Sequence, residues 1–198
     1  MAAAGTTIER PTVEGPSPDN SRFATLIFLM AGVMLFAGLV GAYLVLRYGG
    51  KGFPAPGMPP LPVGLAGFNT IVIALSSLAL RRAVRSMRAL DALGLRRGLF
   101  LSAVLGMAFL GLQVIQWRRL LALGLSFAGT TYGTTFYVIT GAHAAHALSG
   151  VIWLLAIVVR QREVWVPERR RRGIESCALY WHFVGLVWGG LYLVLYLL

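Results

Sequence analysis

Five apolar segments alternate with shorter polar or basic stretches, over residues 23–46, 63–80, 99–117, 132–159 and 176–198. Each has 18 residues or more, and a helix of about 20 residues crosses the roughly 30 Å hydrocarbon core of a bilayer. The pattern predicts an all-α integral membrane protein, a bundle of five transmembrane helices within one domain over 23–198. Residues 1–22 are polar and lack the features of a signal peptide, so we expect them to form a flexible tail.

The composition supports a membrane protein and weakens two other readings. Hydrophobic residues make up 57% of the chain, charged residues 13%, and the mean hydropathy is +0.72. A net charge of +11 is compatible with nucleic-acid binding, but in so apolar a chain the basic residues are expected to face anionic headgroups, and no nucleic-acid partner is predicted. The single cysteine, Cys177, excludes an intrachain disulfide and is interpreted as a small apolar residue.

The basic residues also predict an orientation in the membrane. Of the 18 Lys and Arg, 14 lie in the N-terminal tail, the connection after the second span and the connection after the fourth. These three stretches share one side of the membrane. The positive-inside rule places that side, and with it the N-terminus, in the cytoplasm, and places the C-terminus outside.

Two histidines share the fourth apolar span. His143 and His146 lie one helical turn apart, and ionisable side chains at membrane depth face protein rather than lipid, so this helix is expected inside the bundle. With His182 they could in principle bind metal or haem. However, His146 should lie about 20 Å from the basic end of its helix and His182 about 10 Å from the same end of its own. We therefore predict structural histidines and no metal, while a membrane redox enzyme remains an alternative.

No Asp or Glu falls inside any of the five apolar segments. Proton- or cation-coupled carriers usually place a carboxylate there, so a stand-alone small transporter is a weaker alternative, kept because histidines also relay protons. The other intramembrane polar, aromatic and small residues are expected to join helices or to contact lipid. These candidates are Asn69, Gln113, Gln116, Gly141, Gly150, Tyr180 and Trp181.

Several motifs together resemble one family, subunit III of the haem-copper respiratory oxidases, in its short five-helix bacterial form. The fourth span is similar to the family signature at Thr140, Gly141, His143, His146 and Gly150. The last span resembles a second signature at Tyr180-Trp181-His182-Phe183-Val184 and Val187-Trp188. Weaker likenesses lie at Tyr43 to Arg47, at Phe68-Asn69-Thr70 with Ser76-Ser77, and at Gln113 with Trp117.

The resemblance implies a non-catalytic accessory subunit in aerobic electron transport, in the cytoplasmic (inner) membrane of a bacterium. It would stabilise subunit I, share a complex with subunit II and hold phospholipid. Haem and copper would belong to those partner subunits, with no cofactor in this chain. An accessory subunit of a quinol oxidase or a nitric-oxide reductase is the alternative, and membership of a larger respiratory supercomplex is left open.

Three positions depart from the family pattern, and each lacks a carboxylate. Gly32 stands where the first span usually has Glu, Gln116 replaces a Glu in the third span, and Gly185 replaces an Asp in the last. The family is thought to assist proton uptake. Neutral spans weaken that expectation here, whereas a scaffolding and lipid-holding role needs only shape and hydrogen bonds.

Overall fold

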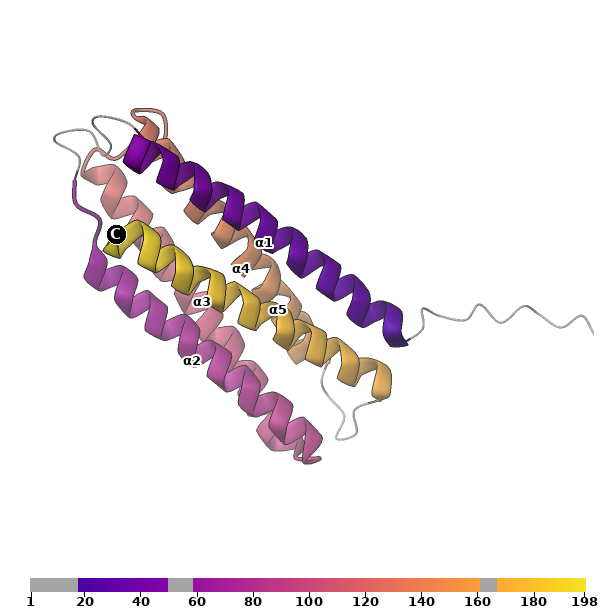
Figure 1. Ribbon diagram of the computed structural model, residues 1–198. Helices are drawn as coiled ribbons and strands as arrows, with labels where there is room; N and C mark the ends of the chain where they lie inside the picture. Colours follow the sequence, from indigo (N-terminus) through magenta and orange to yellow (C-terminus); the bar gives the residue numbers. More distant parts are fainter. Residues whose placement is uncertain (1–17, 50–58, 161–166) are drawn as a thin grey trace, which may run out of the picture.

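The computed structural model describes residues 18–49, 59–160 and 167–198, which form five long helices and no strand (Figure 1). The helices are α1 (Pro18–Gly49), α2 (Val63–Arg88), α3 (Ala92–Ala122), α4 (Thr131–Arg160) and α5 (Glu168–Tyr192), with a short π-helix, η1 (Leu193–Leu197), continuing α5. Each of the five includes a stretch long and apolar enough to cross a membrane. The predicted all-α membrane bundle is confirmed.

The helices extend beyond the apolar segments that predicted them. α2 continues through the arginines to Arg88, and α3 and α5 begin at Ala92 and Glu168. Hydropathy marks the part of a helix that lies in hydrocarbon, whereas arginine favours helix and its long side chain reaches the interface. α1 likewise begins at Pro18, inside the predicted tail. The rest of that tail (1–17), most of the predicted connection before α2 (50–58) and part of the second basic segment (161–166) lie outside the described residues.

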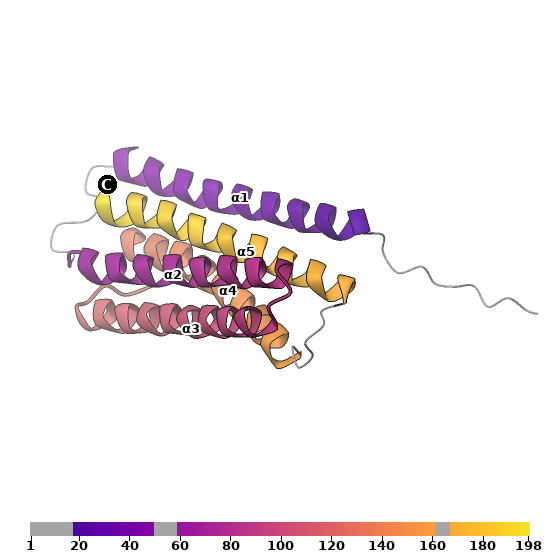
Figure 2. The same ribbon diagram turned by 90° about the horizontal axis from the view of Figure 1, so that it is seen from below.

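A tight turn joins α2 to α3, where the sequence suggested a longer basic loop. Leu90 adopts a left-handed conformation with φ 59°, and Asp91 caps α3 by accepting a hydrogen bond from the Gly94 amide at 2.9 Å. An acceptor at this position satisfies an amide that the first turn of a helix leaves unpaired. The two helices therefore run antiparallel and closely packed (Figure 2).

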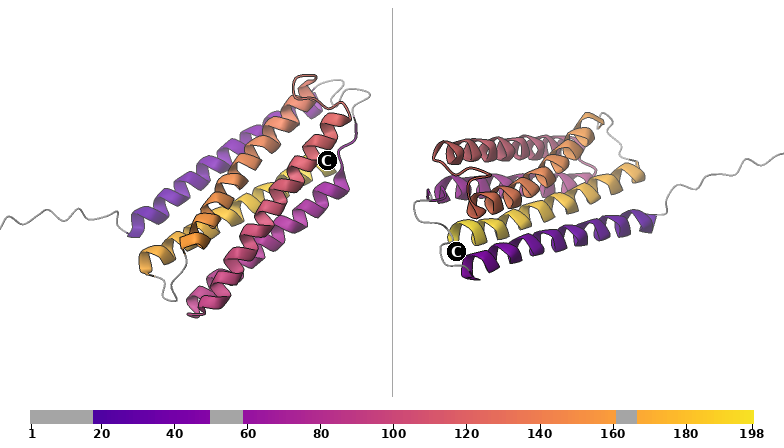
Figure 3. Two further views of the ribbon diagram at one scale, coloured as in Figure 1. Left: turned by 180° about the vertical axis from the view of Figure 1, so that it is seen from behind. Right: turned by 90° about the horizontal axis from the view of Figure 1, so that it is seen from above.

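The remaining helices pack around this pair. α5 contacts α2 and α4, α4 contacts α3, and α1 packs mainly on α5 and α4 at the edge of the bundle (Figure 3). At one end, the Arg47 guanidinium donates to the carbonyl oxygen of Leu198 and ties α1 to the end of the chain. In the most apolar 18-residue stretch of α1, only 11% is buried inside the bundle, whereas the corresponding stretches of α2 and α5 are each 39% buried. α1 therefore offers most of its apolar surface to lipid or to another protein.

Three apolar clusters fill the interior along the length of the bundle. One surrounds Trp181 and includes the buried, free Cys177. The second surrounds Phe136 and Tyr196. The third surrounds Phe109 and Trp188.

Candidate functional site

His143 occupies a fully buried position enclosed by aromatic rings. Its ring centroid lies 6.0 Å from that of Phe36 in α1, 5.8 Å from Phe109 in α3 and 5.2 Å from Trp188 in α5. Neither ring nitrogen has a hydrogen-bond partner among the described residues. This one side chain therefore packs α4 against three other helices, as expected for an inner helix.

His146 packs its ring against Phe36 of α1, with the ring centroids 5.2 Å apart. Its Nδ1 lies 2.8 Å from the Ala142 carbonyl oxygen, which can only accept, so Nδ1 carries the hydrogen. The Tyr180 hydroxyl donates to the His146 carbonyl oxygen at 2.9 Å and lies 2.7 Å from the Ser149 hydroxyl. Tyr180 thus joins the two signature segments through hydrogen bonds.

His182 lies apart from this arrangement. It is half-buried and lines a cavity between α2 and α5 together with Arg81, whereas His143 packs against aromatic rings. Over the described ranges, no three His, Cys, Asp or Glu side chains are grouped as metal ligands would be. The geometry therefore joins His143 and His146 to helix packing and leaves His182 on the bundle surface.

Asn69, near the start of α2, and Gln113, in the last third of α3, join these two helices. Both are buried, and Asn69 Nδ2 donates to the Phe109 carbonyl oxygen at 3.3 Å and to Gln113 Oε1 at 3.5 Å. The Asn69 Oδ1 and Gln113 Nε2 atoms have no partner in the part of the chain that the structure describes. The two amides form an interhelical contact, and each keeps one atom that could form a further hydrogen bond.

Gln116 and Trp117 connect α3 to two further elements. Gln116 Nε2 donates to the Tyr196 hydroxyl in η1 at 2.6 Å, and Trp117 Nε1 donates to Thr140 Oγ1 in α4 at 3.2 Å. The partners Tyr196 and Thr140 lie 80 and 23 residues away along the chain. Nothing in the sequence pattern paired these residues, because only the tertiary fold brings them together.

Trp181 forms the most elaborate junction. Its indole Nε1 donates to Ser76 Oγ in α2 at 3.0 Å, and Ser76 Oγ donates in turn to the Ser102 carbonyl oxygen in α3 at 2.8 Å. Three helices are linked by two consecutive hydrogen bonds in a fully buried place. Ser102 was not among the predicted residues, although its four-residue spacing from Gly106 is a small-residue pattern that marks close helix contacts.

Glycines make room for the same indole. A β-carbon at Gly150 would lie 2.6 Å from Trp181 Cε3, and one at Gly106 would lie 2.9 Å from Trp181 Cζ2. Carbon atoms in contact normally stand about 3.5–4.0 Å apart, so both positions need glycine. Gly141 differs: a β-carbon there would have no neighbour within 4 Å, so no close contact inside this chain requires glycine at this position.

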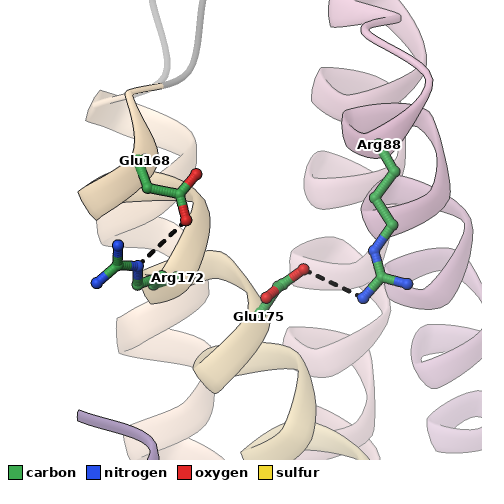
Figure 4. Close-up of polar contacts among 4 residues, drawn as sticks. All are labelled: Arg88, Glu168, Arg172 and Glu175. Atoms are coloured by element: carbon green, nitrogen blue, oxygen red, sulfur yellow. Dashed lines mark hydrogen bonds and ion pairs between the residues drawn. The ribbon is translucent and has the colours of Figure 1, made fainter. Parts of the chain in front are cut away.

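The positions that lack the family's carboxylates are packed against their neighbours. A β-carbon at Gly32 would lie 2.9 Å from Phe183 Cζ, and one at Gly185 would lie 3.1 Å from Ser77 Oγ. Described acids lie instead at the basic end of the bundle, where Glu175 pairs with Arg88 at 3.1 Å and Glu168 pairs with Arg172 at 3.2 Å (Figure 4). The interior therefore offers hydrogen-bonding groups for helix association and no carboxylate for proton exchange at the positions that the family signatures reserve for one.

Comparison with known proteins agrees with these motifs. The chain matches the family model of cytochrome c oxidase subunit III over residues 17–198. It is 34% identical to cytochrome c oxidase subunit 3 of a Synechocystis species over 182 residues, which cover 91% of this chain and 77% of that protein. Its identity is 30% to cytochrome c oxidase subunit 3 of Thermostichus vulcanus, covering 91% and 89% of the two chains. It is 31% to the probable cytochrome c oxidase subunit 3 of Nocardia farcinica, covering 90% and 88%. The resemblance inferred from the motifs is confirmed, and the chain belongs to the cytochrome c oxidase subunit III family.

Proposed function

We propose that this chain is a non-catalytic subunit of a haem-copper terminal oxidase that packs against subunit I, within a complex that also contains subunit II. The complex would lie in the cytoplasmic membrane of a bacterium, with the N-terminus of this chain on the cytoplasmic side. Haem and copper would be held by the partner subunits. Membership of the subunit III family supports a place in a cytochrome c oxidase complex.

The observation that carries this proposal is the contrast between the interior and the surface of the bundle. The buried polar groups face other helices of the same chain, as in the Asn69–Gln113 and Trp181–Ser76 contacts. The outer surface is apolar, and in α1 the side chains of Phe28 and Met34 are 57% and 70% exposed. In a bilayer, such a surface is free to take up lipid or the apolar face of another subunit.

Bound phospholipid is part of the same proposal. A cavity of about 520 Å³ lies between the basic ends of α4 and α5 and is lined by Trp153, Arg160 and Arg170 among others. An aromatic ring beside two guanidinium groups at a membrane boundary suits a lipid headgroup. A lipid bound there would fill the space between this chain and the neighbouring subunits of the complex.

The experiment compares the oxidase purified with this chain and after its removal. We expect the stripped complex to keep its haem spectrum and its initial turnover rate, and then to lose activity within fewer turnovers than the intact complex. Failure of the first turnover with the metals intact would contradict an accessory role.

The same preparations separate this proposal from the alternatives. Membership of the subunit III family does not favour a stand-alone transporter or a three-histidine redox enzyme. A haem spectrum in the isolated chain would support the redox-enzyme hypothesis. Ion flux into vesicles that contain only this chain would support the transporter hypothesis. Oxidation of quinol or reduction of nitric oxide by the purified complex would assign it to a different oxidase or reductase.

A further inference from the structure

The end of α2 forms a turn with a characteristic pair of hydrogen bonds. The Leu90 amide donates to the Met87 carbonyl oxygen at 3.2 Å, and the Asp91 amide donates to that of Ser86 at 2.9 Å. These two bonds define the Schellman motif, in which the residue after the helix cap is left-handed and is usually glycine. Here that residue is Leu90, with φ 59°. The turn therefore holds a leucine in a backbone conformation that its side chain disfavours.

The end of α3 closes with the same motif but with the usual residue. The Gly124 amide donates to the Leu121 carbonyl oxygen, and the Leu125 amide donates to that of Leu120, both at 3.0 Å. Gly124 has φ 91°, a conformation that glycine adopts without steric cost. The two turns share their hydrogen bonding and differ in this one residue. The turn between α2 and α3 therefore does not need its leucine.

The Leu90 side chain also gains little from packing inside the chain. It is 82% exposed, and Leu93, in the first turn of α3, is 67% exposed. Neither belongs to the three apolar clusters of the described interior. Two leucines thus face outward at the turn, one of them in an unfavourable backbone conformation. Such a conformation, where the fold does not require it, marks a candidate functional position.

The lipid bilayer does not account for these leucines. α2 runs to Arg88, eight residues or about 12 Å beyond Leu80, the last residue of its apolar segment. Leu93 precedes Leu99, the first residue of the next apolar segment, by six residues or about 9 Å. The headgroup layer is about 5–8 Å thick on each side of the hydrocarbon. Both leucines therefore lie too far out to reach hydrocarbon and face water unless a protein covers them.

Two arginines stand beside the leucines. Arg96 and Arg97 lie one helical turn after Leu93 on the same face of α3, are exposed, and form no ion pair among the described residues. Side chains on a helix tilt toward its N-terminus, so both guanidinium groups reach toward the turn and away from the hydrocarbon. Residues 81–98 contain six arginines and one acid, Asp91, whose carboxylate caps α3. The turn therefore presents an apolar and basic surface, here named the tip surface, made of Leu90, Leu93, Arg96 and Arg97.

We propose that the tip surface docks an acidic segment of a neighbouring protein, in the aqueous phase at this end of the bundle. Leu90 and Leu93 enter an apolar pocket of that segment, and Arg96 and Arg97 pair with its carboxylates. Protein interfaces combine an apolar core with an enrichment in arginine, and complementary charge selects an acidic partner. An anionic lipid surface would match the charge but would leave the leucines in water. The inference rests on the proposed function only in that the chain lies in a membrane complex, and it is independent of the reaction of that complex.

Cross-linking from Ala89 identifies what covers the tip surface. Ala89 is exposed and precedes Leu90, so an Ala89→Cys variant labelled with a benzophenone maleimide places a photoreactive group beside the leucines without removing them. Membranes that contain the complex are irradiated, and cross-linked peptides are sequenced by mass spectrometry. We expect a cross-link to a segment of another protein that is rich in Asp and Glu. A cross-link to lipid alone, to this same chain or to a protein segment without acids, or no cross-link, would overturn the proposal.

Two changes at position 90, made in the Ala89→Cys variant, separate the role of the side chain from that of the turn. Leu90→Gly removes the side chain and favours the left-handed backbone, so the Tm should stay at or above that of the parent variant. The cross-link yield should nevertheless fall at least about five-fold, the equivalent of about 1 kcal/mol. Leu90→Met keeps an apolar side chain of similar volume and should keep the yield. A yield retained in Leu90→Gly, or lost in Leu90→Met, would overturn the proposal.

A matched pair of charge variants tests the arginines in the same background. Arg96→Gln/Arg97→Gln removes two adjacent charges that reach toward the turn, whereas Arg81→Gln/Arg82→Gln removes two adjacent charges of α2 that tilt toward the hydrocarbon. We expect the cross-link yield to fall at least about five-fold in the first pair only. Equal yields in the two pairs would overturn the proposal. Haem measured in the same samples tests the proposed function separately, because the tip surface is expected to bind its partner whether or not the complex is an oxidase.

Discussion

Replacement of two glycines in the same helix by alanine should have opposite effects on stability. Gly150 and Gly141 both lie in α4, so Gly→Ala brings each the same gain in helix propensity, about 1 kcal/mol. At Gly150 the new methyl group would lie 2.6 Å and 2.7 Å from two ring carbons of Trp181 and 3.2 Å from Tyr180 Cε1. This is about 1 Å closer than carbon atoms normally approach.

The magnitude depends on whether Trp181 can move. The indole is fully buried, and its Nε1 donates to Ser76 Oγ at 3.0 Å, so a shift that relieves the overlap stretches this hydrogen bond. Overpacking of this kind costs typically about 1–3 kcal/mol. We therefore expect Gly150→Ala to be less stable than Gly141→Ala by about 1–3 kcal/mol. Gly141→Ala itself should be as stable as the wild type or slightly more so, because no atom lies within 4 Å of its new methyl group.

The assay is thermal unfolding of the two variants and the wild type in one detergent, followed by tryptophan fluorescence. For a chain of this length, 1 kcal/mol corresponds to about 2–4 °C in Tm, so the two variants should differ by several degrees. Equal Tm values would show that Trp181 moves aside at no cost, and would refute the conclusion that Gly150 is required for its packing.

Two further predictions follow from hydrogen bonds and ion pairs, each with its own control. Ser76→Ala leaves the buried Trp181 indole N–H without an acceptor and should cost about 1–3 kcal/mol in the same unfolding assay. Ser77→Ala removes a neighbouring hydroxyl that has no hydrogen bond among the described residues and should change stability by less than about 0.5 kcal/mol; a loss equal to that of Ser76→Ala would argue against the indole bond. Arg88→Gln breaks the ion pair with Glu175, but the arginine side chain is 61% exposed, so we expect a loss below about 1 kcal/mol, and a larger loss would indicate a buried role.

The class of the fold followed from the sequence because hydropathy reports directly on membrane crossing. All five apolar segments lie within helices that are long and apolar enough to cross a membrane. The ends of the helices were less predictable, since the arginines of α2 continue the helix to Arg88 instead of forming a loop. The left-handed conformation of Leu90 could not be foreseen either, because leucine rarely adopts it.

The contacts between buried residues were harder to predict from the sequence than the class of the fold. Gly141 and Gly150 both belong to the same signature, and both were expected to join helices or to contact lipid. Which of them meets a neighbouring helix depends on the rotation of α4 about its own axis. The partner of Gln116, Tyr196, lies 80 residues away in η1. Sequence spacing identifies a polar residue that needs a partner at membrane depth, whereas its partner is set only by the tertiary fold.

The short turn at Leu90 has a consequence for how the protein is made. α2 and α3 are adjacent in the chain and run antiparallel. Each contacts the other more extensively than it contacts any other helix. Contacts between neighbours in sequence close at little entropic cost. The two helices can therefore enter the bilayer together as a hairpin while α4 and α5 are still being synthesised. α4 and α5 can then pack against a hairpin that has already formed.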